Sequence, residues 1–82
     1  MKINWDGKSK NIIGSKMKQF RKMKKMNQRQ LAESLQCRGL DFSSLTVLRI
    51  EKGDRFVADF ELAIIADFFG ITADELLGVI KE

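Results

Sequence analysis

The chain has 82 residues, of which 44% are hydrophobic, and this composition suits one compact domain. A chain this short hides only about 60 to 65% of its unfolded surface, so a deep enzymatic cleft is not expected. The single Cys37 cannot form an internal disulfide, and without His it cannot complete a zinc site. No set of nucleophile, base and orienting group is present. We therefore expect no enzyme, no metal, no cofactor and no small-molecule ligand.

The sequence also lacks the segments that direct a chain into or across a membrane. It has no apolar run of about 18 residues and no apolar signal-peptide region after its short polar start. A cytoplasmic protein with no membrane partner is the expectation.

Charge is divided unevenly along the chain, although its net value is +4. Residues 1–39 hold eight Lys and three Arg against two acidic residues, a net charge of +9, whereas residues 40–82 have a net charge of −5. The run from Lys16 to Lys25 contains no acid and suits a polyanion. A solvated lysine-rich helix face is the alternative.

The first predicted elements are an N-terminal arm, residues 1–10, and a helix that follows it. "WDGK" is typical of a turn, and Asn11 is a candidate N-cap for a helix that runs to about Lys25. The apolar residues of this helix have the spacing of one helix face: Ile13, Met17 and Phe20.

The second predicted helix follows the N-cap Asn27 in "NQRQLAESL" and continues to about Arg38. We expect Gly39 to end it in the left-handed conformation and Leu40 to fold back onto it, as in a Schellman motif. The link around residues 36–41 is then longer than the about 3 to 4 residues that usually join such helices.

The third predicted helix starts at the N-cap Ser43 and ends at Gly53. Val47 and Ile50 fall on its inward face. Two apolar residues, Leu45 and Leu48, fall on its outward face.

A fourth helix is predicted from Asp59 to Gly70, and a fifth opens with the capping box formed by Thr72 and Glu75. No strand pattern is present, so residues 11–82 are expected to form one all-α domain of five helices. The fourth helix carries a second apolar stripe: Phe60, Ile64 and Phe68.

The order of these elements and three of their segments resemble the lambda-repressor and Cro-like (Xre-type) helix-turn-helix family. The segments are "IGSKMKQFRKMKKMNQRQLAESL", "TVLRIEKG" and "GITADELLG", and the resemblance covers Ile13 to Gly78. It implies a five-helix domain, from whose usual pattern this chain departs in the enlarged link. It also implies a sequence-specific regulator of transcription of bacterial or phage type, with repression as its expected action. The partner would be double-stranded DNA, with the helix at about 44–52 in the major groove.

The resemblance assigns base contacts to Ser44, Leu45 and Arg49. An Arg can bond both O6 and N7 of guanine, whereas Leu45 can only meet a thymine methyl group. The alternative for Arg49 is a contact to phosphate alone.

Phosphate contacts are expected at positions that combine the resemblance with positive charge or with a helix start. Gln28 follows the cap Asn27 at a helix N-terminus, where free N–H groups and the helix dipole favour an anion. Its alternative is an ordinary exposed residue. The full set is Lys16, Lys22, Asn27, Gln28, Ser43, Thr46, Lys52 and Arg55.

The resemblance also implies an ion pair between Arg21 and Glu51, which would lock the first helix onto the third. It implies a homodimer, with the candidates Phe68, Val79 and Ile80, against the alternative of a monomer. The enlarged link is either a decoration or a contact, to DNA through Arg38 or to a partner through Cys37 and Leu40. A rival function is protein–protein interaction, as in an antitoxin or a regulator of another factor, through Leu45 and Leu48.

Overall fold

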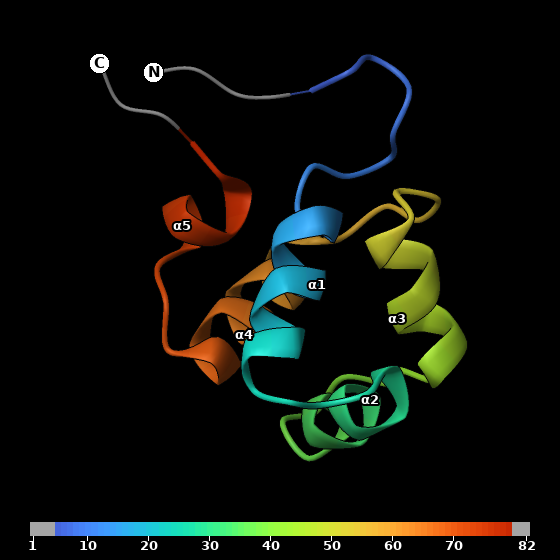
Figure 1. Cartoon of the computed structure of the whole chain (residues 1–82), viewed down its shortest axis with the longest axis vertical. Helices are drawn as coiled ribbons and strands as arrows, with labels where there is room; N and C mark the ends of the chain where they lie inside the picture. Colours follow the sequence, from blue (N-terminus) through green and yellow to red (C-terminus); the bar gives the residue numbers. More distant parts are fainter. Residues whose placement is uncertain (1–4, 80–82) are drawn as a thin grey trace.

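A computed structural model of the chain describes residues 5–79, which form five α-helices and, within that range, no strand. The helices are α1 (Gly14–Met23), α2 (Gln28–Gln36), α3 (Ser44–Glu51), α4 (Asp59–Phe69) and α5 (Ala73–Leu77). In Figure 1, α1 lies between α3 and α5, and α2 crosses at the end of α1 and α3. The predicted all-α fold of five helices is confirmed. None of the described helices is long and apolar enough to span a membrane.

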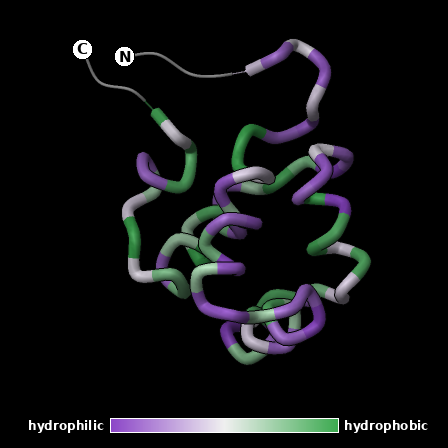
Figure 2. Tube along the Cα trace, in the orientation of Figure 1, coloured by the Kyte–Doolittle hydropathy of each residue, from purple (hydrophilic) through white to green (hydrophobic). Residues whose placement is uncertain are grey.

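One apolar core holds the helices together, and every helix contributes to it. Hydrophilic residues predominate along α1 and the turn after it, whereas much of α4 is hydrophobic (Figure 2). The core therefore draws on few residues of α1. Its members are Ile13, Met17, Leu31, Ala32, Leu35, Leu40, Phe42, Val47, Ile50, Ile65, Ala66, Phe69 and Leu76.

Polar side chains start three helices where the sequence predicts them. The Asn27 Oδ1 accepts a hydrogen bond from the Gln30 N–H over 2.7 Å. Ser43 caps α3, and Thr72 caps α5. Because each cap satisfies an N–H that lacks a helical partner, the starts of α2, α3 and α5 are fixed locally.

Asn11 is not the N-cap that the sequence predicts, because α1 begins only at Gly14. The helix also ends at Met23 instead of about Lys25. The Asn11 Oδ1 still accepts hydrogen bonds from the N–H groups of Ile13 and Gly14, over 3.1 and 2.9 Å. Its Nδ2 donates to the carbonyls of Ile50 and Arg55, over 3.1 and 2.8 Å. Asn11 therefore joins the start of α1 to the end of α3.

Gly14 makes the closest backbone approach between α1 and α3. A Cβ atom there would lie 2.4 Å from the carbonyl oxygen of Ile50 and 2.9 Å from that of Glu51. No larger residue fits without moving one of the two helices, so the first turn of α1 rests directly on the last turn of α3.

The enlarged link closes as a Schellman motif, although α2 ends at Gln36 and not at Arg38. The Leu40 N–H donates to the Leu35 carbonyl over 3.1 Å, and the Gly39 N–H donates to the Gln36 carbonyl over 3.0 Å. Gly39 has φ +98°, and Leu40 is buried. Both predicted roles are confirmed, and the last residues before Gly39 form a tighter turn instead of more α-helix.

The same link is attached to the C-terminal end of α4. Arg38 forms an ion pair with Asp67, and its guanidinium lies 5.4 Å from the centre of the Phe68 ring. The Gln36 side chain donates to the Phe42 carbonyl over 2.5 Å. These contacts attach the link to α4, an arrangement that was not among the predicted alternatives.

Residues 5–10, the described part of the predicted arm, form a turn against the end of α3. The Asp6 carboxylate accepts hydrogen bonds from the N–H groups of Ser9 and Lys8, both 2.8 Å, and these bonds lower its pKa. The Lys10 N–H donates to the Gly53 carbonyl over 2.8 Å. Trp5 stays exposed, with its indole N–H on the Ser9 carbonyl.

Candidate nucleic-acid interface

The outward face of α3 carries the three residues predicted to contact bases. Ser44, Leu45 and Arg49 are exposed, whereas Val47 and Ile50 on the opposite face are fully buried. No described residue forms a hydrogen bond or ion pair with the Arg49 guanidinium, so all of its N–H donors face solvent. The buried face therefore fixes α3 while its polar face remains available to a ligand.

Leu45 and Leu48 do not share the same environment, although both were predicted to face outward. Leu45 is 50% exposed, which confirms its placement. Leu48 is half-buried, so its outward placement is wrong in part. The reason is helix geometry, because Leu48 lies one residue from buried Val47 and at the edge of the apolar face.

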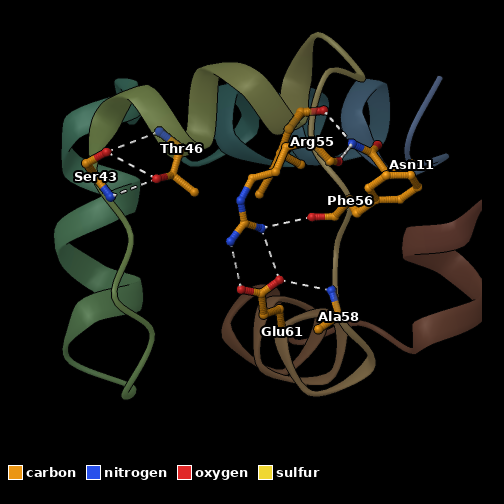
Figure 3. Close-up of polar contacts among 8 residues, drawn as sticks. Asn11, Ser43, Thr46, Arg55, Phe56, Ala58 and Glu61 are labelled. Carbon is orange, nitrogen blue, oxygen red and sulfur yellow. Dashed lines mark hydrogen bonds and ion pairs between the residues drawn. The ribbon is translucent and has the colours of Figure 1, made fainter.

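Ser43 and Thr46 hydrogen-bond to each other in the first turn of α3. The Ser43 Oγ accepts from the Thr46 N–H over 3.2 Å, and the Thr46 Oγ1 accepts from the Ser43 N–H over 3.3 Å (Figure 3). A hydroxyl has one donor and two acceptor positions, so this reciprocal capping leaves bonding capacity. The two side chains set where α3 begins.

Glu51 joins three helices at the C-terminal end of α3. The Arg21 Nε donates to its Oε2 over 2.7 Å, and an Arg21 terminal nitrogen donates to its Oε1 over 3.1 Å. The predicted ion pair is confirmed, with the Arg21 and Glu51 side chains 9% and 3% exposed. Arg21 also donates to the Met26 carbonyl over 2.8 Å. This bond and the bidentate pair hold α1 against α3 and the start of α2.

Gln28 belongs to this cluster as well as to the start of α2. Its side-chain nitrogen donates to the Glu51 Oε1 over 3.1 Å, a partner that sequence reasoning did not identify. This bond uses one of the two N–H donors of the amide nitrogen inside the domain. No described residue accepts from the backbone N–H groups of Gln28 and Arg29, which point out of the helix N-terminus. An anion can meet these groups without displacing the side chain.

The predicted lysines do not all lie on one side of the molecule. Lys22 and Lys52 are exposed, at the C-terminal ends of α1 and α3. Lys16 instead lines a groove between α1 and α5 with Glu75, and its aliphatic chain lies beside Gly78. The structure thus separates Lys16 from the residues around α3.

Arg55 has a partner that the sequence did not suggest. Its two terminal nitrogens donate to the two carboxylate oxygens of Glu61, over 3.0 and 3.1 Å, and one of them also donates to the Phe56 carbonyl over 3.0 Å (Figure 3). The hydrogen bonds from Arg55 to Glu61, and after them one from the Ala58 N–H, lower the pKa of Glu61 despite its burial. The available signal was the third position of Glu61 in α4, where an acid commonly bonds the helix start.

The dimer candidates lie toward the C-terminus, and Ile80 is outside the described residues. Phe68 is half-buried, with Lys24 Nζ 5.4 Å from its ring centre as well as Arg38. Val79 is half-buried and lines the groove between α1 and α5. Among residues 5–79, no group of three or more His, Cys, Asp and Glu side chains is placed to hold a metal ion.

Two helices joined by a defined link, with the second pinned at both ends and exposed along one face, define a helix-turn-helix domain. α2 and α3 pack closely on each other, and α1 supports both through Arg21. This class follows from the geometry of the fold and of the site together.

Comparison with solved structures assigns the chain to a narrower group. It is similar to the crystal structure of the DNA-binding domain of BldD, with a TM-score of 0.70 and 29% identity over 89% of this chain and 99% of that one. It is also similar to the S. venezulae BldD DNA-binding domain, with a TM-score of 0.68 and 30% identity over 84% of this chain and 96% of that one. The chain belongs to the same family of helix-turn-helix domains. No protein-family profile and no curated protein sequence matches it.

Proposed function

We propose that this chain is a DNA-binding regulator of transcription that places α3 in the major groove of double-stranded DNA. The observation that carries the proposal is its similarity, at about 30% identity, to nearly the whole of two DNA-binding domains. The exposed face of α3 supports it, because a major groove admits an α-helix and side chains on such a face can reach base edges.

Base reading is proposed for Ser44, Leu45 and Arg49. Arg49 is the strongest reader, because its unpaired guanidinium can bond O6 and N7 of one guanine, a pair that gives roughly 1 to 3 kcal/mol of discrimination. Leu45 offers an apolar contact to a thymine methyl group, and Ser44 accepts several bases.

Phosphate contacts are proposed at the starts of α2 and α3 and at the C-terminal ends of α1 and α3. The backbone N–H groups at Gln28 suit one phosphate, since helix N-termini bind anions. The exposed amines of Lys22 and Lys52 suit others, and the side chains of Asn27, Ser43 and Thr46 lie at the two helix starts. Such contacts position the protein without reading sequence.

Membership of the lambda-repressor and Cro-like (Xre-type) group, repression and a homodimer complete the proposal. A symmetric dimer would bind two half-sites roughly 34 to 36 Å apart. Val79 and Ile80, beyond α5, and Phe68 on α4 are the proposed contacts. Phe68 already lies under two cationic side chains, so the end of the chain is the stronger candidate.

A second candidate function is binding to a protein partner through the same face. The observation that favours it is Leu45, half of whose surface is exposed beside the polar readers. Salt dependence separates the two functions. DNA binding through about six phosphates weakens with a log–log slope near −5, whereas an apolar protein contact hardly responds to salt.

The test is a selection of bound sequences from random duplexes, followed by affinity measurements at two or more salt concentrations. We expect Arg49→Ala to relax preference at one base pair and Lys22→Ala to weaken all duplexes alike. Lys22 is the matched control, because it is exposed and basic and belongs to α1 instead of α3. Equal loss on selected and random duplexes for Arg49→Ala contradicts base reading. No enrichment by the wild-type chain contradicts the function itself.

A further inference from the structure

We propose that Arg55 is a positioning residue that clamps both ends of α3 to the start of α4, and that it does not hold a DNA phosphate. The proposal rests on the proposed function, since it concerns how α3 is held for reading. Arg55 was predicted to contact a DNA phosphate because of its charge and its position after α3, and the proposal replaces that assignment.

The first jaw of the clamp is Glu61, in the first turn of α4. Arg55 and Glu61 face each other with two parallel hydrogen bonds of 3.0 and 3.1 Å, the geometry in which an arginine and a carboxylate bind best (Figure 3). The Glu61 side chain is 11% exposed, and its Oε1 also accepts from the Ala58 N–H over 2.9 Å. The carboxylate is therefore fixed to its own helix start and cannot follow Arg55 outward.

The second jaw lies at the other end of α3. The Arg55 guanidinium carbon is 5.1 Å from the centre of the Phe42 ring, within the range of a cation–π contact. Phe42 is buried and directly precedes the N-cap Ser43. One side chain from the segment after α3 thus contacts the residue that leads into α3.

The main chain of Arg55 is held at the same time. The Asn11 side chain donates to the Arg55 carbonyl over 2.8 Å and to the Ile50 carbonyl over 3.1 Å. The backbone that presents Arg55 is therefore tied to α1 and to the last turn of α3. α3 packs chiefly on α2 and α1, so the Arg55 clamp adds a direct link from its flanks to α4.

These contacts leave Arg55 poorly suited to a phosphate. Its hydrogen bonds to Glu61 and Phe56 use three of its five N–H donors, and its side chain is only 33% exposed. A phosphate at the remaining donors would stand close to the Glu61 carboxylate and be repelled by it. Lys52, which is exposed and lacks an acidic partner among the described residues, has neither restriction.

The two roles predict opposite signs for one substitution. If Arg55 positions α3, removal of the carboxylate in Glu61→Gln loosens the clamp and weakens DNA binding. If Arg55 binds a phosphate, the same substitution frees its guanidinium and strengthens DNA binding. We expect Glu61→Gln and Arg55→Gln each to weaken binding to a selected duplex on the order of tenfold. The log–log salt slope should stay at its wild-type value in both. Lys52→Gln, the matched control, should lower the slope by about one. Tighter binding by Glu61→Gln, with a slope steeper by about one, overturns the clamp.

Two further measurements separate positioning from loss of fold and from failure of the proposed function. Thermal unfolding by circular dichroism shows that each variant is folded at the binding temperature, and Arg55→Lys, which keeps the charge but not the two-pronged contact, should bind as weakly as Arg55→Gln. Amide hydrogen exchange needs no DNA: the Val47 N–H, bonded to the Ser43 carbonyl over 3.1 Å, should exchange faster in Glu61→Gln. Unchanged exchange at Val47 overturns the clamp, whereas a wild-type chain that selects no duplex overturns only the proposed function.

Discussion

Two arginine–glutamate pairs hold the C-terminal side of α3, and they differ in depth and in reach. Arg21 and Glu51 are 30 residues apart, and their side chains are 9% and 3% exposed. Arg55 and Glu61 are six residues apart and are 33% and 11% exposed. The deep pair joins helices from distant parts of the chain, so its loss affects the whole fold. The shallow pair joins the segment after α3 to the next helix, so its loss affects mainly how α3 is positioned.

The largest effect is expected from breaking the deep pair with Glu51→Ala. The substitution leaves the nearly buried Arg21 without its carboxylate and the Gln28 amide without its acceptor. We expect the free energy of unfolding to fall by about 3 to 5 kcal/mol, a large part of the stability of a chain of this size. Urea titration followed by circular dichroism measures it. A loss below about 1 kcal/mol would place this pair in the same class as a surface pair.

A smaller but still substantial effect is expected from Gly14→Ala, which attacks the same α1 to α3 contact without touching a charge. The added Cβ would meet the Ile50 carbonyl oxygen at 2.4 Å, so the helices must separate, at a cost of about 1 to 3 kcal/mol. Gly39→Ala is the matched control, because nothing lies within 4 Å of its Cβ position and only its φ of +98° is strained. Thermal unfolding compares the two. A smaller shift for Gly14→Ala than for Gly39→Ala contradicts the close approach.

The long link and the helix caps were predictable from the sequence for local physical reasons, whereas the deep pair was not. Gly39 followed by Leu40 has the chemistry of a Schellman motif, which depends only on neighbours along one helix. Caps at Asn27 and Ser43 act within one turn. The pair of Arg21 with Glu51 came from the family resemblance, because nothing in its spacing of 30 residues indicates contact.

The shallow pair was missed because its partner depends on where α4 starts relative to the loop before it. Arg55 follows α3 and carries charge, so a phosphate contact was the simpler hypothesis. Arg55 is held beside Glu61 by the contact of its guanidinium with the Phe42 ring and by the bond from Asn11 to its carbonyl, and neither contact has a sequence signal. The side-chain bond from Gln28 to Glu51 was missed for the same reason, since it depends on the angle between α2 and α3.

The shallow pair should also respond to pH. Arg55 lowers the pKa of Glu61 below its ordinary value of 4.5, so the ionised carboxylate is favoured by folding. This stabilisation is fully present above pH 4.5 and is lost as pH falls through the lowered pKa. We expect the free energy of unfolding of the wild type to exceed that of Glu61→Gln by about 1 kcal/mol or less near pH 6, and this difference to shrink in acid. Urea titrations at several pH values test this, and a difference that grows in acid contradicts it. Asp6, whose pKa is also lowered, is common to both chains and cancels.

The smallest effect is expected at a third pair, which extends the comparison to the surface. Arg29 and Glu33 lie one turn apart on α2 with a distance of 3.0 Å, but their side chains are 82% and 59% exposed. The arginine also precedes the acid, the weaker order for such a pair, and sits in the first turn of α2, where the helix dipole disfavours a cation. We expect Glu33→Ala to change the free energy of unfolding by less than about 0.5 kcal/mol, with little dependence on salt. The shortest N–O distances of the three pairs lie between 2.7 and 3.0 Å. A loss of stability at Glu33 comparable to that at Glu51 would therefore mean that distance decides how much each pair contributes. The expected decrease from the deep pair to the surface pair instead attributes the contribution to burial and to the helices that each pair joins.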